Sequence, residues 1–419
     1  MKWSELPTPC YVVDESLLER NLKILQGVME RTGAHILLAQ KAFSMYALYP
    51  EIGKILCGAT ASGLYEARLC AEEMVRPLKI YGRRCENHIF SPAYREEDFA
   101  EILEYCDHIV FNSWKQVAKL GARAKAAGKS IGLRINPECS TQEGHAIYDP
   151  CAPGSRLGTT KEEFETYLKT EDGYGNKFLA LLDGIHFHTL CEQDSDDLEK
   201  TLDAVEEKFG AYLFRMKWIN FGGGHHITRE GYDIPRLERC IRRMQDKYGL
   251  EVYLEPGEAV ALNAGFLITS VLETRDTEWK LSKLTSAEAK QGSVGLSEEF
   301  RQEKLHLAIL DISAACHMPD VLEMPYRPPL QDSGLPGEKH FTYRLGGPTC
   351  LAGDIIGDYS FERPLKEGDR LVFEDMAIYS MVKNNTFNGM PLPAIAIREK
   401  NGECRIVKQF SYEDFKCRI

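Results

Sequence analysis

The sequence predicts an α/β protein built from a (β/α)8, TIM-like barrel and a second, β-rich domain of sandwich or barrel type. Two observations support this fold class. Short β-rich runs alternate with amphipathic helical patterns as far as about residue 264, and beyond that point strand-like segments follow one another with proline and glycine between them. A chain of 419 residues is also long enough for two or three domains.

The barrel prediction depends on the alternation of strands and helices. Helical patterns such as Lys115–Lys129 and Asp196–Phe209 separate the strand-like runs. The runs expected to form the eight strands are 35–41, 58–62, 78–82, 108–113, 131–136, 182–188, 216–221 and 251–256. Eight βα units are what a closed barrel of this type contains. We therefore assign residues 18–264 to the barrel.

The remaining residues, 1–17 and 265–419, are assigned to the β-rich domain. Cys10–Asp14 is expected to form its first strand, and Asp14 is placed to cap a helix over Leu17–Met29. The later strands of this domain are expected at Phe266–Leu272, Leu305–Ile312, His340–Leu345, Arg370–Phe373 and Ala394–Arg398.

The composition is that of a soluble globular protein, with 43% hydrophobic and 27% charged residues. Residues 275–304 are polar and rich in Glu, Lys and Ser, which predicts a flexible insertion. A net charge of −12 disfavours nucleic acid as a partner; it would attract cations such as polyamines, and it is also ordinary for an enzyme surface.

The sequence has no apolar run after a basic start and none of the length of a membrane span, so we expect a cytoplasmic protein without a membrane partner. Thirteen cysteines without a CxxC pair favour reduced thiols over a disulfide framework or a structural zinc site. We therefore expect no bound metal.

Lys41 is the leading candidate for catalysis. It follows an apolar run, His35–Gln40, that is expected to be a strand, and barrel enzymes carry their chemistry at the carboxyl ends of strands. A lysine with a lowered pKa can form a Schiff base with an aldehyde cofactor such as pyridoxal 5'-phosphate. The alternative is a solvent-exposed lysine that only ends the strand.

Two further motifs follow predicted barrel strands. Gly222–Gly224 could let backbone N–H groups surround a phosphate, although a tight turn also explains three glycines. Glu255, in Glu255-Pro256-Gly257, could hold a proton on a pyridine nitrogen, or could form a salt bridge at the barrel mouth.

His186 and His188 close another predicted strand with both rings on one face. Two imidazoles without further ligands make a weak metal site, so stacking on a flat cofactor fits better than a metal, and a core histidine is the remaining alternative. Late in the chain, Gly347-Pro348-Thr349-Cys350 presents a thiol in a turn, followed by Asp354. Free cysteines usually lie in the core, so a catalytic role for Cys350 depends on its neighbours.

Taken together and in order, these motifs resemble the fold-type III pyridoxal-phosphate-dependent decarboxylases, the group of ornithine and diaminopimelate decarboxylases. Within that group, the segments Cys316–Arg327 and Cys350–Asp354 resemble sequence motifs of carboxynorspermidine (carboxyspermidine) decarboxylases. The resemblance covers Thr8 to Asn388. The residues that carry it are Lys41, His188, Gly222–Gly224, Glu255-Pro256-Gly257, Gly347-Pro348-Thr349-Cys350 and Tyr379 followed by Thr386-Phe387-Asn388-Gly389.

The resemblance implies a role for each matching residue. Lys41 would hold pyridoxal phosphate covalently, His188 would stack on its ring, and Glu255 would pair with the ring nitrogen. Gly223, Gly224 and Tyr379 would bind the phosphate, and Arg134 would lie near the phenolic oxygen. Cys350, contributed by the partner subunit of a homodimer, would protonate the carbon that loses its carboxylate. The substrate would be a carboxylated polyamine, in a step of polyamine synthesis.

Substrate-binding candidates are acidic because a polyamine tail is cationic. They are Glu258, Asp311 and Asp354. Glu258 stands where ornithine decarboxylases have a phosphate-binding arginine, and Cys191 matches a serine of the family. As alternatives, Asp311 could cap a turn and Asp354 could be a solvated loop acid.

Other activities remain open at this stage. A diaminopimelate or other basic amino-acid decarboxylase would need an arginine facing the second carboxylate of diaminopimelate, and Arg327 or Arg344 could serve. An amino-acid racemase shares the barrel and the lysine, but it uses a tyrosine opposite the lysine and lacks the Gly-Pro-Thr-Cys turn. A non-catalytic homologue would not need both Lys41 and Cys350.

Overall fold

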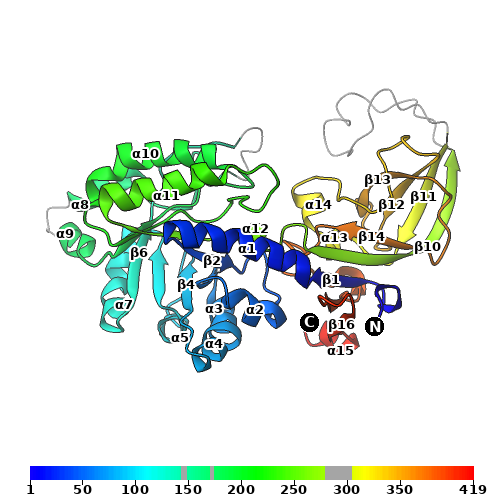
Figure 1. Ribbon diagram of the computed structural model, residues 1–419, viewed down its shortest axis with the longest axis horizontal. Helices are drawn as coiled ribbons and strands as arrows, with labels where there is room; N and C mark the ends of the chain where they lie inside the picture. Colours follow the sequence, from blue (N-terminus) through cyan, green and yellow to red (C-terminus); the bar gives the residue numbers. More distant parts are fainter. Residues whose placement is uncertain (143–148, 170–173, 279–303) are drawn as a thin grey trace. The chain divides into compact units, whose positions relative to one another are not determined.

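A computed structural model describes residues 1–142, 149–169, 174–278 and 304–419 (Figure 1). The chain divides into two compact units. One unit comprises Glu19–Val260, and the other combines Met1–Leu18 with Ala261–Ile419. Each unit has its own sheet.

The first unit is a closed barrel in which eight parallel strands follow one another in sequence order. The strands are β2 (His35–Ala39), β3 (Gly58–Ala61), β4 (Glu86–Phe90), β5 (His108–Phe111), β6 (Ser130–Arg134), β7 (Gly184–His186), β8 (Trp218–Asn220) and β9 (Glu251–Leu254). β9 pairs with β2 to complete the circle, so the predicted fold class is confirmed.

Helices alternate with the barrel strands, beginning with α1 before β2, and account for the alternation seen in the sequence (Figure 1). They are α1 (Glu15–Thr32), α2 (Tyr49–Gly53), α3 (Leu64–Cys70), α4 (Arg76–Ile80), α5 (Phe99–Tyr105), α6 (Trp114–Gln116), α7 (Ala122–Ala126), α8 (Lys161–Leu168), α9 (Tyr174–Leu179), α10 (Ser195–Leu213), α11 (Ile234–Tyr248) and α12 (Glu258–Ala261). The Asp14 carboxylate accepts from the N–H groups of Ser16 and Leu17, which confirms it as the cap of α1.

One predicted barrel strand was wrong. Residues 78–82 belong to the end of α4 and the turn after it, and the strand β4 comes later, at Glu86–Phe90. Leu78 is buried on the helix, whereas Ile80 and Tyr81 are each 83% exposed. The apolar residues at 78–82 were therefore mistaken for a strand: Leu78 faces the core from a helix, and Ile80 and Tyr81 are exposed.

The second unit contains a sheet in the order β13-β12-β11-β10-β1-β15-β16, with β14 paired to β10. Its strands are β1 (Cys10–Asp14), β10 (Gly265–Glu278), β11 (Lys304–Leu310), β12 (Phe341–Gly346), β13 (Ile355–Phe361), β14 (Arg370–Glu374), β15 (Ala394–Arg398) and β16 (Cys404–Lys408). Short helices α13 (Ala314–His317), α14 (Asp320–Glu323) and α15 (Tyr412–Lys416) complete it. The sequence predicted β1, β10, β11, β12, β14 and β15, and missed β13 and β16.

The predicted insertion at 275–304 begins too early. Residues 275–278 belong to β10 and pair with β11, whose first residue, Lys304, is the partner of Glu278. The remainder of that stretch, 279–303, lies outside the described residues.

The barrel interior is filled by a large ring that faces two glycines. Gly132, Gly184 and Trp218 are neighbours across β6, β7 and β8. A Cβ atom on Gly184 would lie 2.0 Å from Trp218 Cδ2, and one on Gly132 would lie 2.3 Å from Trp218 Cη2. Only residues without a side chain leave room for the indole, whose Nε1 donates to Ser130 Oγ at 2.9 Å.

We expect Gly184→Ala to lower the free energy of unfolding by about 1–3 kcal/mol, because the added methyl group forces the Trp218 ring out of its place. Denaturant titration followed by tryptophan fluorescence measures this change. Gly63→Ala is the matched control, since nothing lies within 4 Å of its added Cβ and its φ is not positive. An equal loss of stability in both variants would contradict the packing argument.

Candidate active site

The carboxyl ends of five barrel strands meet around one pocket. Lys41 follows β2, Arg134 ends β6, His188 follows β7, Gly223 follows β8 and Glu255 follows β9, and all five line this pocket. Parallel strands end on the same face of a barrel, which explains why residues so distant in sequence come together.

Lys41 has the properties of a nucleophilic amine. It remains accessible through the pocket mouth, yet protein surrounds it on most sides. Burial, followed by the positive charge of Arg134, lowers the pKa of Lys41. A larger fraction of the amine is therefore neutral, which an attack on an aldehyde requires.

Glu255 is a buried carboxylate that stays ionised. Burial would raise its pKa, but His186 and Asn220 outweigh that effect, and the pKa falls to about 2. Glu255 Oε2 lies 3.3 Å from His186 Nε2, and Oε1 accepts from Asn220 Nδ2 at 2.8 Å. This is the state needed to keep a pyridine nitrogen protonated.

The glycine loop after β8 forms a tight cradle. Gly222 and Gly224 have positive φ values of 70° and 84°. A Cβ on Gly224 would lie 2.0 Å from the Leu190 carbonyl oxygen, and one on Gly223 would lie 2.6 Å from that of Glu255. Glycine is therefore required here both by conformation and by close packing of backbone.

His188 is held as a neutral ring beside this loop. The Gly223 N–H donates to His188 Nδ1 at 2.8 Å, so this nitrogen carries no proton. Burial, Lys41 and Arg134 hold the pKa of His188 well below its usual value. A flat, uncharged and oriented imidazole can stack on an aromatic cofactor. The hydrogen bond from the Gly223 amide therefore holds the His188 ring in one orientation.

Arg134 is anchored under the pocket by two contacts. Its Nη2 donates to the His188 carbonyl at 3.1 Å, and its guanidinium lies 4.5 Å from the centre of the Phe90 ring. It is 5% exposed, so its charge acts on Lys41 and His188 through protein with little screening by water.

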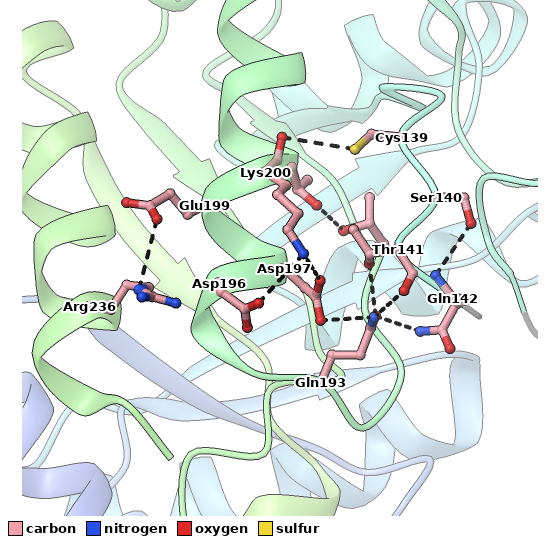
Figure 2. A network of polar contacts seen from close by, with 12 residues as sticks. Cys139, Ser140, Thr141, Gln142, Gln193, Asp196, Asp197, Glu199, Lys200 and Arg236 are labelled. Atoms are coloured by element: carbon pink, nitrogen blue, oxygen red, sulfur yellow. Dashed lines mark hydrogen bonds and ion pairs between the residues drawn. The ribbon is translucent and has the colours of Figure 1, made fainter. Parts of the chain in front are cut away.

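Gln193 connects the loops that follow β6, β7 and β8. Its backbone N–H donates to the Gly224 carbonyl at 3.0 Å, and its carbonyl accepts from the His226 N–H at 3.2 Å. Its side chain donates to the Thr141 carbonyl and to Asp197, and accepts from Gln142 (Figure 2). The glycine loop is thus fastened to the start of α10 and to the β6 loop.

Cys350 and Asp354 lie in one turn of the second unit. Cys350 is exposed, and its N–H donates to Asn388 Oδ1 at 2.8 Å, which joins two motifs that the sequence had singled out separately. Asp354 is 3% exposed, so it is not the solvated loop acid considered as an alternative. Its carboxylate accepts from Ser313 Oγ, the Ala315 N–H and Thr349 Oγ1, and thereby holds the turn.

Asp311 and Tyr379 also belong to the second unit. Asp311 Oδ1 accepts from Thr269 Oγ1 at 2.5 Å and from the Ser270 N–H at 2.9 Å, so part of its carboxylate is used within the sheet. Tyr379 is half-buried and has a φ of 47°, an uncommon conformation for a tyrosine.

Sequence reasoning missed the residues that support the site. His186 was noted only as a companion of His188, yet its Nε2 lies 3.3 Å from Glu255 Oε2. The sequence analysis assigned no role to Asn220, which directly precedes the glycine loop, or to Gln193. A polar residue at the end of a predicted barrel strand is the signal that could have pointed to Asn220.

The fold and pocket match a known family. Residues 10–377 match the model of the family described as pyridoxal-dependent decarboxylase, C-terminal sheet domain. The chain belongs to the pyridoxal-dependent decarboxylases, and it is a decarboxylase whose cofactor is pyridoxal 5'-phosphate.

Relatives within this family are similar over the whole chain. A Campylobacter jejuni carboxynorspermidine/carboxyspermidine decarboxylase is 38% identical, with all of both chains covered. A Synechocystis carboxyaminopropylagmatine decarboxylase is also 38% identical, covering 99% of this chain and 96% of the relative. A crystal structure of the Campylobacter jejuni carboxynorspermidine decarboxylase with norspermidine matches with a TM-score of 0.81 at 36% identity, covering 99% of this chain and 100% of that one.

The residues present fit the cofactor. The pocket supplies an amine of lowered pKa, a neutral imidazole and an ionised carboxylate, and Gly223 of the glycine loop lines the same pocket. Lys41, His188, Glu255 and the glycine loop are the groups that would hold it. Within the described residues, no helix has the length and apolar character needed to cross a membrane.

We expect Lys41→Ala to lose the visible absorbance of the bound cofactor, because no amine remains to attach it. Absorbance spectra of protein incubated with pyridoxal phosphate and then desalted measure this loss. Lys41→Arg is the control for charge, since it keeps a cation without a nucleophilic amine. If either variant retained the spectrum of the unmodified protein, another residue would be the attachment point.

Proposed function

We propose that this protein removes the carboxylate from a carboxylated triamine, carboxynorspermidine or carboxyspermidine, and so releases norspermidine or spermidine in polyamine synthesis. The observation that carries this proposal is full-length similarity to a decarboxylase of these two substrates. The related structure that contains norspermidine adds support.

The two arginines considered for diaminopimelate are engaged within the protein. Arg344 makes two hydrogen bonds to Asp358, at 2.8 and 2.9 Å, and Asp358 is 1% exposed. Arg327 donates to the carbonyls of Gly334 and Asp358 and lies over the Tyr359 ring. Recruiting either guanidinium to a second carboxylate would break these contacts, which favours a substrate with a cationic far end.

The side chains would divide the work as follows. When bound, pyridoxal phosphate would supply an acceptor for the electron pair that the departing carboxylate leaves behind. Lys41 would attach the cofactor, Glu255 would keep its ring nitrogen protonated, and His188 would stack on its ring. Cys350 delivers the proton that replaces the carboxylate. Asp311, of which only Oδ1 is used in the hydrogen bonds to Thr269 and Ser270, and Glu258 are the carboxylates we assign to the cationic tail. Asp354 is buried and its carboxylate holds the Cys350 turn, so it is engaged within the protein like the two arginines and is not assigned to the tail.

We further propose a two-fold homodimer in the cytoplasm, with Cys350 acting from the partner subunit. The resemblance to the family supports the shared site. All thirteen cysteines are free, which suits a reducing compartment.

The direct test is CO2 release from a parallel set of substrates. Carboxynorspermidine and carboxyspermidine are expected to give the highest kcat/KM. Carboxyaminopropylagmatine, meso-diaminopimelate, ornithine, arginine and lysine are the competitors. The equal similarity of the Synechocystis relative makes carboxyaminopropylagmatine the sharpest comparison. Preferential turnover of diaminopimelate would instead make the protein an enzyme of lysine synthesis, and a D-amino acid product without CO2 would indicate a racemase.

We expect Cys350→Ala to keep the cofactor spectrum but to lower kcat by about 10²–10⁴-fold, because its proton donor is lost. Steady-state kinetics with analysis of the product measures both the rate and the site of protonation. Cys417→Ala removes another exposed thiol and should leave kcat unchanged. Full activity in Cys350→Ala would mean that a different group supplies the proton.

A further inference from the structure

Asn220 is the last residue of β8 and is completely buried, at 0% exposed. Its side-chain amide makes two hydrogen bonds of 2.8 Å. Nδ2 donates to Glu255 Oε1, and Oδ1 accepts from the Gly222 N–H. One short side chain therefore contacts both the buried carboxylate of the pocket and the glycine loop.

A backbone hydrogen bond closes these contacts into a ring. The Glu255 N–H donates to the Gly222 carbonyl at 2.8 Å. Asn220, Gly222 and Glu255 thus form a cycle of three hydrogen bonds that joins the end of β8, the glycine loop and the residue after β9. The position of the loop and the position of the carboxylate are therefore linked.

The chemistry of the two neighbours fixes which way the amide of Asn220 faces. A backbone N–H can only donate, so the atom opposite Gly222 must be Oδ1. Nδ2 then faces Glu255, where the ionised carboxylate accepts. An aspartate could accept from Gly222 but could not donate to Glu255 unless it carried a proton, and an aliphatic side chain could do neither.

A simple turn accounts for only half of this arrangement. A side-chain oxygen of asparagine or aspartate often accepts from the N–H two residues later in a tight turn. That explains the contact with Gly222, and it would be made equally well by aspartate. The donor directed at Glu255 has no part in such a turn, and a buried charge that loses a hydrogen-bond donor is strongly destabilised.

We propose that Asn220 is a positioning residue that ties the glycine loop to the charge of Glu255, and thereby couples the two ends of the cofactor, its phosphate and its ring nitrogen. The coupling extends to His188, because the next residue of the loop, Gly223, holds that ring through its N–H. In this role Asn220 acts through Glu255 and the loop and not on the reacting atoms. The inference rests on the cofactor roles assigned to these residues and not on the choice of substrate.

Asn220→Asp separates the two contacts. The new side chain has the same size and still accepts from Gly222, but its second oxygen takes the place of Nδ2, which lies 2.8 Å from Glu255 Oε1. Two carboxylates this close share one proton, and the pKa of the pair is raised. While the proton is present, the hydrogen bond and a single negative charge are kept. When pH rises through the raised pKa, the proton is lost and the two carboxylates repel each other.

We therefore expect kcat of the cofactor-loaded Asn220→Asp variant to fall about ten-fold or more with rising pH, in a step that the unmodified protein lacks. Other titratable groups around Glu255 are the same in both proteins, so a step seen only in the variant belongs to the new pair. These groups are Lys41, His88, Tyr94, Arg134, His186 and His225.

Asn87→Asp is the matched control for the kinetic measurement. Asn87 is also a fully buried asparagine of a barrel strand, β4, and its Nδ2 donates to the carbonyls of Ala67 and Tyr105. Its replacement should lower stability without adding the pH step to kcat. A step of equal size in both variants would mean that any buried aspartate in the barrel has this effect.

Infrared difference spectroscopy follows the same proton in cofactor-free protein. Relative to the unmodified protein, Asn220→Asp should show a protonated carboxyl group that disappears as pH rises. Adding Glu255→Gln should abolish this band at the same pH, because a single carboxylate beside an amide donor ionises. The unmodified protein has no such proton to lose, since the pKa of Glu255 is about 2.

Asn220→Leu removes both contacts at once. Cofactor-free Asn220→Leu, titrated with pyridoxal phosphate and followed by absorbance, should bind about ten-fold or more weakly than the unmodified protein, because Gly222 and Glu255 each lose a buried partner. Asn220→Asp keeps the Gly222 contact and should bind the cofactor nearly as tightly as the unmodified protein at a pH where the pair is protonated.

Three outcomes would overturn the proposal. They are a pH profile of kcat in Asn220→Asp that matches the unmodified protein, a carboxyl band that survives the addition of Glu255→Gln, and unchanged cofactor affinity in Asn220→Leu. If Asn220→Leu does not fold, the measurements on Asn220→Asp decide. The infrared and binding experiments omit substrate, so an error in the assigned substrate leaves them unaffected.

Discussion

The site depends on keeping one carboxylate ionised inside the protein. Glu255 is 7% exposed, and burial by itself raises the pKa of its carboxyl. His186 and Asn220 act in the opposite direction, and both reach Glu255 because β7, β8 and β9 are adjacent and in register. The order of the barrel strands therefore also determines the charge state of this buried carboxylate.

The same dependence explains what the sequence could predict about the site. Lys41, Arg134, His188, Gly223 and Glu255 all stand at or just beyond the ends of strands, and parallel strands in a barrel bring such positions together. Gln193 owes its importance to contacts between loops. A single sequence carries no pattern for contacts of that kind, so this residue emerged only from the structure.

The strands and helices could be predicted where hydrophobic residues recur at regular spacing. The prediction failed for strands whose polar side chains hide that spacing. The true β4 begins Glu86-Asn87-His88, and its polar side chains make contacts within the protein: Asn87 donates to the carbonyls of Ala67 and Tyr105 on flanking helices, and His88 pairs with Glu86 and stacks on His108. A strand with polar groups facing a buried network does not look apolar. β16 has a similar weakness, because it is a short strand at the edge of the sheet and is mostly exposed.

The place of β1 in the second sheet has a consequence for how the chain is made. β1 is a central strand, paired with β10 through Cys10–Val13 and with β15 through Cys10–Asp14. Its parallel partner, Ala394–Arg398, comes after the whole barrel and after β10 in the chain. During synthesis β1 therefore stays unpaired while the barrel is made, pairs first with β10, and keeps its other edge open until β15 follows. The barrel can fold before the sheet to which β1 belongs is complete.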